Sequence, residues 1–118
     1  MKERRFRRSF FFILLDKSFS ICYNKIMYNY ERLSDEIKLA VSSDHTFGTD
    51  AVILSHFAKI KARDKALDMG TGCGIIPFLW LRDSRINNVS CLDIQQNAFE
   101  QVSHSIEINN LSDRIKAY

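Results

Sequence analysis

Asp68-Met69-Gly70-Thr71-Gly72-Cys73-Gly74 is the stretch that decides the fold, because three alternating glycines follow a short apolar run directly. Residues 65–67 predict a strand that ends at Asp68, and the apolar segment 75–81 predicts a helix. Pro77 suits the first turn of that helix, where a backbone N–H has no partner within the helix. The stretch therefore predicts a strand, a glycine loop and a helix in succession.

The residues downstream repeat this alternation of strand and helix. Residues 89–92 predict a second buried strand that closes at Asp93, and residues 114–118 begin a third. Between them, residues 95–109 predict a helix with one apolar face, and Asn109-Asn110 can adopt the left-handed conformation that ends a helix. This order implies right-handed crossovers and a parallel, doubly wound α/β sheet.

Upstream of the glycine loop the pattern is weaker. Residues 30–41 are charged with intermittent Leu and Ile, which favours a short helix or an irregular segment leading into a brief strand at residues 39–41. An apolar-periodic helix then begins near Ala51. We expect Thr49 to cap it and Asp50 to stabilise its first turn.

The composition fits one small globular domain, with 46% hydrophobic and 26% charged residues in a chain of 118. The net charge of +3 is uneven, since residues 1–26 hold seven Lys/Arg against two Asp/Glu and the remainder holds ten against twelve. The basic character thus belongs to the N-terminal segment, and charge gives no support for a nucleic-acid-binding face on the domain.

We interpret residues 1–26 as an N-terminal extension, arising from an over-long start assignment, and residues 27–118 as the domain. The apolar run 10–15 is shorter than a signal-peptide core or a membrane span. We therefore expect no stable membrane insertion and a cytoplasmic location. A membrane-surface helix in this segment is the alternative.

The cysteines and histidines offer no metal site. Cys22, Cys73 and Cys91 are far apart and form no C-x-x-C pair, so we expect free thiols in a reducing compartment. The three histidines, His45, His56 and His104, are equally scattered, and the sequence assigns no chemistry to any of them.

The glycine spacing separates two classes of cofactor site. The dinucleotide fingerprint needs a third glycine three residues after the second, and Ile75 occupies that position, which disfavours a nicotinamide cofactor. Asp68 adds an acceptor that suits a cationic amino acid group. Asp93 lies 19 residues after Gly74, the usual interval for a carboxylate that binds ribose hydroxyls. A plain strand-to-helix turn and a solvated strand end are the structural alternatives.

These residues resemble class I S-adenosylmethionine-dependent methyltransferases, with residues 66–74 as the cofactor loop and Asp93 as the ribose-binding acid. More narrowly, the small-domain bacterial enzymes that methylate adenine N6 in valine tRNA are similar in four stretches: Thr46-Phe-Gly-Thr-Asp-Ala-Val-Ile-Leu54, Leu92-Asp-Ile-Gln95, Glu107-Ile-Asn-Asn-Leu111 and Asp113-Arg-Ile115. The likeness covers about residues 30–118 and implies the front half of a seven-stranded, Rossmann-like sheet.

The resemblance also implies ligands and roles. S-adenosyl-L-methionine is the implied cofactor, and tRNA is the implied partner of the full-length family member. The methionine end of the cofactor would lie near Phe47, Thr49 and Asp50, although local capping and packing explain Phe47 and Thr49 as well. Its amino acid portion would lie among Asp68, Gly70, Gly72 and Gly74, and its ribose on Asp93.

The chain departs from the family in one respect. Adenine-N6 enzymes of this kind carry Asn-Pro-Pro-Tyr or a near variant, whereas the only proline here is Pro77. No residue is therefore assigned as catalytic, and we expect a methyltransferase truncated before its catalytic motif and inactive on its own. A non-catalytic remnant remains an alternative, as does a methyltransferase acting on rRNA or a protein glutamine.

Overall fold

The structure is a computed structural model that describes residues 27–118. The interpretation of residues 1–26 as an extension, and the expectation for Cys22, lie outside the described residues. The elements in chain order are β1 (Asn29–Arg32), β2 (Lys38–Val41), α2 (Thr49–Phe57), β3 (Ala66–Met69), α3 (Ile75–Asp83), β4 (Val89–Leu92), α4 (Gln96–Ile108) and β5 (Ile115–Ala117).

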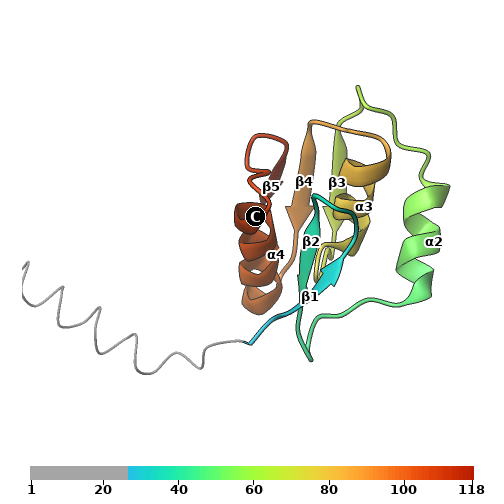
Figure 1. Cartoon of the computed structure of the whole chain (residues 1–118). Helices are drawn as coiled ribbons and strands as arrows, with labels where there is room; N and C mark the ends of the chain where they lie inside the picture. Colours follow the sequence, from blue (N-terminus) through green and yellow to red (C-terminus); the bar gives the residue numbers. More distant parts are fainter. Residues whose placement is uncertain (1–26) are drawn as a thin grey trace, which may run out of the picture.

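A parallel sheet forms the centre of the fold (Figure 1). Its strand order is β3-β4-β5, with Ala66 paired to Val89 and Val89 paired to Ile115. The crossover helices α3 and α4 connect these strands, so the predicted parallel α/β sheet is confirmed. In the view of Figure 1, β3 and β4 run downward, so their carboxyl ends and the start of α2 all lie toward the lower side of the molecule.

The segment before β2 differs from the expectation. Where the charge pattern favoured a helix or an irregular segment, β1 pairs with β2 in an antiparallel hairpin, with Tyr30 opposite Ala40. Its turn is closed by the hydroxyl of Ser34, which accepts hydrogen bonds from the N–H groups of Glu36 and Ile37. The prediction was wrong because the charged residues line the exposed strand β1 and the hairpin turn, and do not form a solvated helix face.

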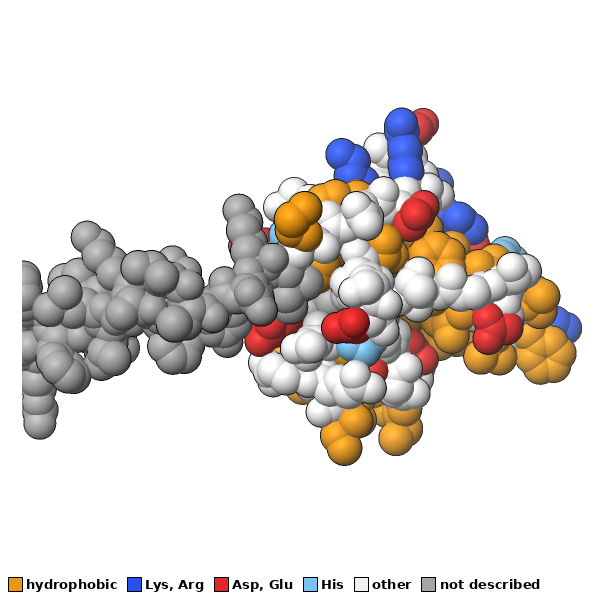
Figure 2. Space-filling model, turned by 90° about the horizontal axis from the view of Figure 1, so that it is seen from below, with side chains coloured by type: hydrophobic (Ala, Val, Ile, Leu, Met, Phe, Trp, Pro, Cys, Tyr) orange, Lys and Arg blue, Asp and Glu red, His pale blue; other side chains and the backbone are white. Residues whose placement is uncertain are grey.

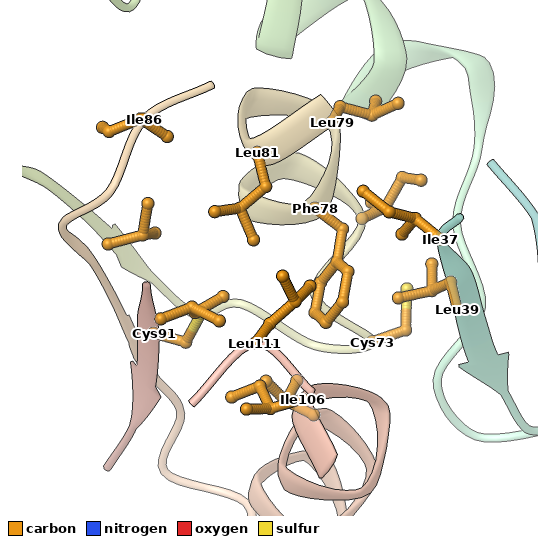
Figure 3. Packing of buried hydrophobic residues seen from close by; sticks show 14 of the residues in the cluster. Ile37, Leu39, Cys73, Phe78, Leu79, Leu81, Ile86, Cys91, Ile106 and Leu111 are labelled. Carbon is orange, nitrogen blue, oxygen red and sulfur yellow. The ribbon is translucent and has the colours of Figure 1, made fainter. Parts of the chain in front are cut away.

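The hydrophobic core lies on one face of the parallel sheet (Figure 3). Val89, Cys91 and Ile115 of the strands belong to one buried cluster with Phe78 of α3 and Ile106 of α4. The alternate strand positions point the other way and stay exposed, because successive side chains of a strand face opposite sides. They include Leu67, Met69 and Leu92. Within residues 27–118, the packed core therefore covers only one face of the sheet.

Strand β2 completes this core from the side of α4. The N–H of Ala40 donates to the hydroxyl of Ser105 at 3.0 Å, and the side-chain amide of Gln101 donates to the carbonyl of Ala40 at 2.9 Å. Asn109 makes the same kind of paired contact with the backbone of Lys38. Polar side chains of α4 thus satisfy the backbone groups of β2 that a neighbouring strand would otherwise pair.

Two predicted helix ends have different outcomes. Asn110 adopts the left-handed conformation expected after α4, with φ of 53°. The predicted cap of α2 is wrong: Gly48 is the N-cap, Thr49 is the first helical residue, and no side chain caps the helix. Glycine can serve at this position, although it supplies no side-chain acceptor.

No helix within the described residues is long and apolar enough to cross a membrane.

Candidate functional site

The glycine loop between β3 and α3 adopts backbone conformations that favour glycine. Gly70, Gly72 and Gly74 have φ values of 78°, 55° and 85°, all in the left-handed region. The N–H of Gly70 donates to the carbonyl of Leu92 at 2.7 Å, which ties the loop to the end of β4. The loop therefore turns sharply at the carboxyl edge of the sheet, where open α/β sheets bind ligands.

The three glycines divide into two kinds by their surroundings. A Cβ atom added at Gly70 or Gly72 would meet nothing within 4 Å, whereas one at Gly74 would lie 3.2 Å from Cγ2 of Val102. Gly74 thus lets the loop pack against α4 and the ring of Phe78. Gly70 and Gly72 leave open space above the backbone, which a ligand can approach closely.

Asp93 lies directly beside the loop. Its Oδ2 accepts a hydrogen bond from the N–H of Gly72 at 2.8 Å, and its Oδ1 accepts one from the N–H of Gln95 at 2.9 Å. Partial burial acts to raise the pKa of this carboxyl, but the bonds from Gln95 and Gly72 and the nearby His45 outweigh burial and lower it. An ionised carboxylate offers about four acceptor positions, so two remain for ligand hydroxyls.

Asp68, at the third position of β3, is the second acid of the site. Burial raises its pKa, the nearby hydroxyl of Thr71 acts to lower it, and the negative charge of Asp93 raises it further. Its Oδ2 is buried and makes no hydrogen bond of normal geometry, and the same is true of Oγ1 of Thr71, so the contact between these two side chains is weak. A buried acceptor without a donor carries a free-energy cost, which a cationic ligand group placed beside it would remove.

The predicted residues around the start of α2 are less closely joined to the glycine loop. Phe47 packs against the hydrophobic core, while Thr49 and Asp50 are exposed at the start of α2. The start of α2 lies toward the same side of the molecule as the glycine loop in Figure 1, but no hydrogen bond connects Thr49 or Asp50 to that loop among the described residues. Their place near a ligand stays a prediction.

Two residues at this end were missed by the sequence reasoning. Gln101, at 1% exposure, donates from its amide to the carbonyl of His45 at 2.8 Å and accepts from the hydroxyl of Ser42 at 2.7 Å. A polar residue within the apolar stripe of α4 was an available signal for Gln101. His45, whose Nε2 is buried without a partner, gave no such signal in the sequence.

The cysteines beside the loop are packing residues. Cys73 and Cys91 are free and buried, which confirms this expectation for the two described cysteines. Burial raises the pKa of both thiols, to about 12 for Cys91, so neither is a thiolate nucleophile at neutral pH. Within residues 27–118, no group of three or more His, Cys, Asp or Glu side chains could hold a metal ion.

Seen from the site end, polar side chains, backbone and carboxylates fill the middle of the surface, and hydrophobic side chains lie mostly toward its rim (Figure 2). The arrangement combines a glycine loop open to close approach with two acids of opposite pKa shift. It suits a ligand with a cation for Asp68 and hydroxyl groups for Asp93.

Comparison with solved structures identifies this fold. TYW2 from Pyrococcus horikoshii, in complex with MeSAdo, superimposes with a TM-score of 0.62 and 20% identity, over 81% of this chain and 37% of the other. A Pyrococcus abyssi tRNA (uracil-54, C5)-methyltransferase in complex with S-adenosyl-L-homocysteine superimposes with a TM-score of 0.55 and 26% identity, over 81% and 24%. The chain thus matches part of the Rossmann-like fold of these methyltransferases, including its three parallel strands β3, β4 and β5.

Sequence comparison finds relatives of this chain among the tRNA methyltransferases. A tRNA1(Val) (adenine(37)-N6)-methyltransferase from Christiangramia forsetii is 35% identical over 72 residues, which cover 60% of this chain and 30% of the relative. One from Flavobacterium psychrophilum is 29% identical over 85 residues, or 69% and 36%. The chain thus spans about a third of the length of these relatives. No family model matches it.

Proposed function

We propose that residues 27–118 form the S-adenosylmethionine-binding domain of a tRNA methyltransferase whose acceptor is adenine N6. The observation that carries the proposal is the bond from the Gly72 N–H to Asp93, which joins the glycine loop to the acid at the end of the neighbouring strand. The cofactor and fold are supported by the methyltransferase likeness, and the acceptor by the named activity of the relatives.

Each proposed contact follows from the chemistry of the ligand. The free acceptor positions of Asp93 suit the two ribose hydroxyls. Asp68 suits the amino group of the methionine portion, because its buried Oδ2 has no donor. Gly70 and Gly72 let the ligand approach the backbone, and Phe47, Thr49 and Asp50 would flank the methionine end. The sulfonium of the bound cofactor supplies the methyl group.

Calorimetric titration with S-adenosylhomocysteine tests the cofactor assignment. We expect the 118-residue chain to bind it, and Asp93→Ala to weaken binding about tenfold or more, since hydrogen bonds to charged groups contribute about 1.5–3 kcal/mol. Asp93→Asn separates loss of charge from loss of the bond to Gly72, because it keeps one side-chain oxygen. Asp113→Ala, an exposed acid on the loop before β5, is the matched control. Equal binding by Asp93→Ala and the parent contradicts the ribose role.

A chimera tests the transfer reaction. Residues 27–118 replace the matching segment of the Christiangramia forsetii enzyme, and valine tRNA lacking the modification is the substrate. We expect N6-methyladenosine in the tRNA, and none from the chimera that carries Asp93→Ala. A chimera that binds S-adenosylhomocysteine but leaves the tRNA unmethylated would show that this segment does not place the cofactor for transfer to adenine N6.

A further inference from the structure

Strand β1 adds nothing to the hydrophobic core, since all four of its residues are exposed. Two tyrosines at its start nevertheless have fixed positions against α4. The ring of Tyr28 stacks on the imidazole of His104 with centroids 5.0 Å apart, and the hydroxyl of Tyr30 is hydrogen-bonded to Nε2 of His104 at 2.9 Å. The cofactor contacts proposed above use none of these three residues.

A surface groove lies between this part of β1 and α4. Successive side chains of a strand point to opposite sides, so Tyr30 and Arg32 share one side of the hairpin. Lys38 of β2 is the cross-strand partner of Arg32. Together with Ile108 at the end of α4, these three residues line a groove of about 330 Å³, called the hairpin groove below. An aromatic ring and two cations thus face the same space.

The charge of the hairpin groove differs from that of the domain around it. Its lining holds two cations and no acid, whereas residues 27–118 hold ten Lys/Arg against twelve Asp/Glu. The backbone of Lys38 is bonded to the side chain of Asn109, while its ammonium makes no hydrogen bond or ion pair within the described residues. Arg32 pairs with Asp35 at 2.6 Å, but both side chains are largely exposed, and such a pair is weak. The groove therefore suits an anionic partner.

We propose that the hairpin groove binds a single-stranded segment of the RNA substrate, with a base stacked on Tyr30 and the phosphates beside Arg32 and Lys38. The inference rests on the proposed function, because it needs an RNA substrate. Proteins bind single strands with aromatic side chains that stack on the bases and with cations that follow the backbone. The ring of Tyr30 is 52% exposed, so a base can reach it.

The two ends of the groove set the direction of the RNA. The negative charge of Glu100 adds to burial in raising the pKa of Tyr28, so an acid lies at the tyrosine end. Phosphates are repelled there and attracted to the Arg32 end, and the bases therefore lie toward the tyrosines. An apolar protein segment fits the groove less well, because it would cover Arg32 and Lys38 without supplying an opposite charge.

RNA binding by the 118-residue chain tests the stacking contact. Fluorescence anisotropy is measured with a labelled valine tRNA transcript lacking the modification and with a short single-stranded oligoadenylate. We expect Tyr30→Ala to weaken the binding of both about tenfold, within the range for the loss of one stacked base. Tyr30→Phe loses the hydroxyl that meets His104 but keeps the ring, so it should bind like the parent. Tyr118→Ala, at a similarly exposed tyrosine just beyond β5, is the matched control.

The salt dependence of binding tests the phosphate contact. Lys38→Ala should weaken binding about threefold and reduce the slope of log Kd against log salt concentration by about one. Lys116→Ala, at an exposed position of β5, should leave the affinity and the slope unchanged. A slope for Lys38→Ala equal to that of the parent would overturn the phosphate contact.

Photo-cross-linking gives a readout that a purely structural role of Tyr30 would not produce. With RNA that contains photoreactive thiouridine, we expect adducts on the tryptic peptide of residues 26–32, which holds Tyr28 and Tyr30. Equal binding of RNA by Tyr30→Ala and Tyr118→Ala would overturn the proposal, as would a parent chain that binds no RNA.

Titration with S-adenosylhomocysteine separates this inference from the proposed function. All the hairpin variants should bind S-adenosylhomocysteine like the parent, because none of the changed residues belongs to the cofactor site. A parent chain that binds S-adenosylhomocysteine but no RNA overturns the RNA groove and leaves the cofactor assignment intact. A parent chain that binds RNA through Tyr30 but no S-adenosylhomocysteine supports the groove and overturns the cofactor assignment.

Discussion

The carboxylate of Asp93, just beyond β4, accepts a hydrogen bond at 2.8 Å from the backbone N–H of Gly72 in the loop after β3. The second carboxylate oxygen of Asp93 accepts a hydrogen bond from the N–H of Gln95, one residue before α4. A single side chain therefore links two strand ends and a helix start. The shape of the loop is set by the protein, before any ligand is considered.

Alanine at Gly74 should destabilise the fold more than alanine at Gly70. Both positions have positive φ, which costs about 1–2 kcal/mol for a residue with a Cβ. At Gly74 the new Cβ also lies 3.2 Å from Val102, so we expect a total of about 2–4 kcal/mol in urea unfolding. At Gly70 the space is open, and the larger effect should be on binding of S-adenosylhomocysteine. Equal losses of stability would refute this division.

Gln101→Ala should lower the free energy of unfolding by about 2–4 kcal/mol, because it leaves the buried carbonyl of Ala40 and the hydroxyl of Ser42 without their partner. Gln96→Ala is the control, since the exposed side chain of Gln96 hydrogen-bonds to Glu100 on the same helix, and its loss should change stability by no more than about 0.5 kcal/mol. Chemical denaturation of the two variants measures the difference. Similar losses of stability in the two variants would show that the side chain of Gln101 does not stabilise the fold through β2 and the loop before α2.

Asp68→Asn should make stability less dependent on pH. Burial raises the folded-state pKa of Asp68 above its unfolded value, so the folded chain binds this proton more tightly. The resulting stability is present below the unfolded pKa and is lost as the pH rises through the folded pKa. Asparagine stays neutral, and the variant should therefore be more stable than the parent at pH 7 but not at pH 4. Thermal unfolding of the parent and the variant at pH 4 and pH 7 measures this change. An equal difference in stability between the two proteins at both pH values would contradict the prediction.

Leu81→Ala and Leu67→Ala should distinguish the two faces of the sheet. Leu81 is 2% exposed in the core, and its truncation should cost about 2–5 kcal/mol. Leu67 is 54% exposed on the opposite face, and its truncation should cost about 1 kcal/mol or less. Urea unfolding of the paired variants makes the comparison. A large loss at Leu67 would mean that this face is packed in solution.

Local patterns in the sequence predicted the strand, loop and helix around Gly70 and the two later strands, because apolar periodicity and glycine spacing are properties of adjacent residues. The strand at residues 39–41 was predicted and is present as β2, but β1 and its pairing with β2 in the hairpin were not predicted. Its strand β1 is wholly exposed, so no apolar alternation marks it, and β2 is held by side chains of α4 about sixty positions away. The Gly48 cap was missed because the prediction looked for a side-chain acceptor, which Thr49 has and glycine lacks, although both residue types occur at this position.

In the site, Asp68 and Asp93 could be placed together because parallel strands bring their carboxyl ends to one edge. The opposite pKa shifts of the two acids could not be predicted from the sequence, because they depend on burial and on the N–H groups that each carboxylate meets. The same holds for His45, whose surroundings come from a loop and a helix distant in sequence.

The bonds that join β2 to α4 also bear on how the chain folds. Ala40 and Ser105 are 65 positions apart, and Lys38 and Asn109 are 71 apart, so both contacts close long loops. Closing such loops is slow and costs more chain entropy than forming the neighbouring pairs β3–β4 and β4–β5. We therefore expect β2 to dock after the parallel sheet has formed. The loop that carries His45 would then be completed late, and the site would mature only at the end of folding.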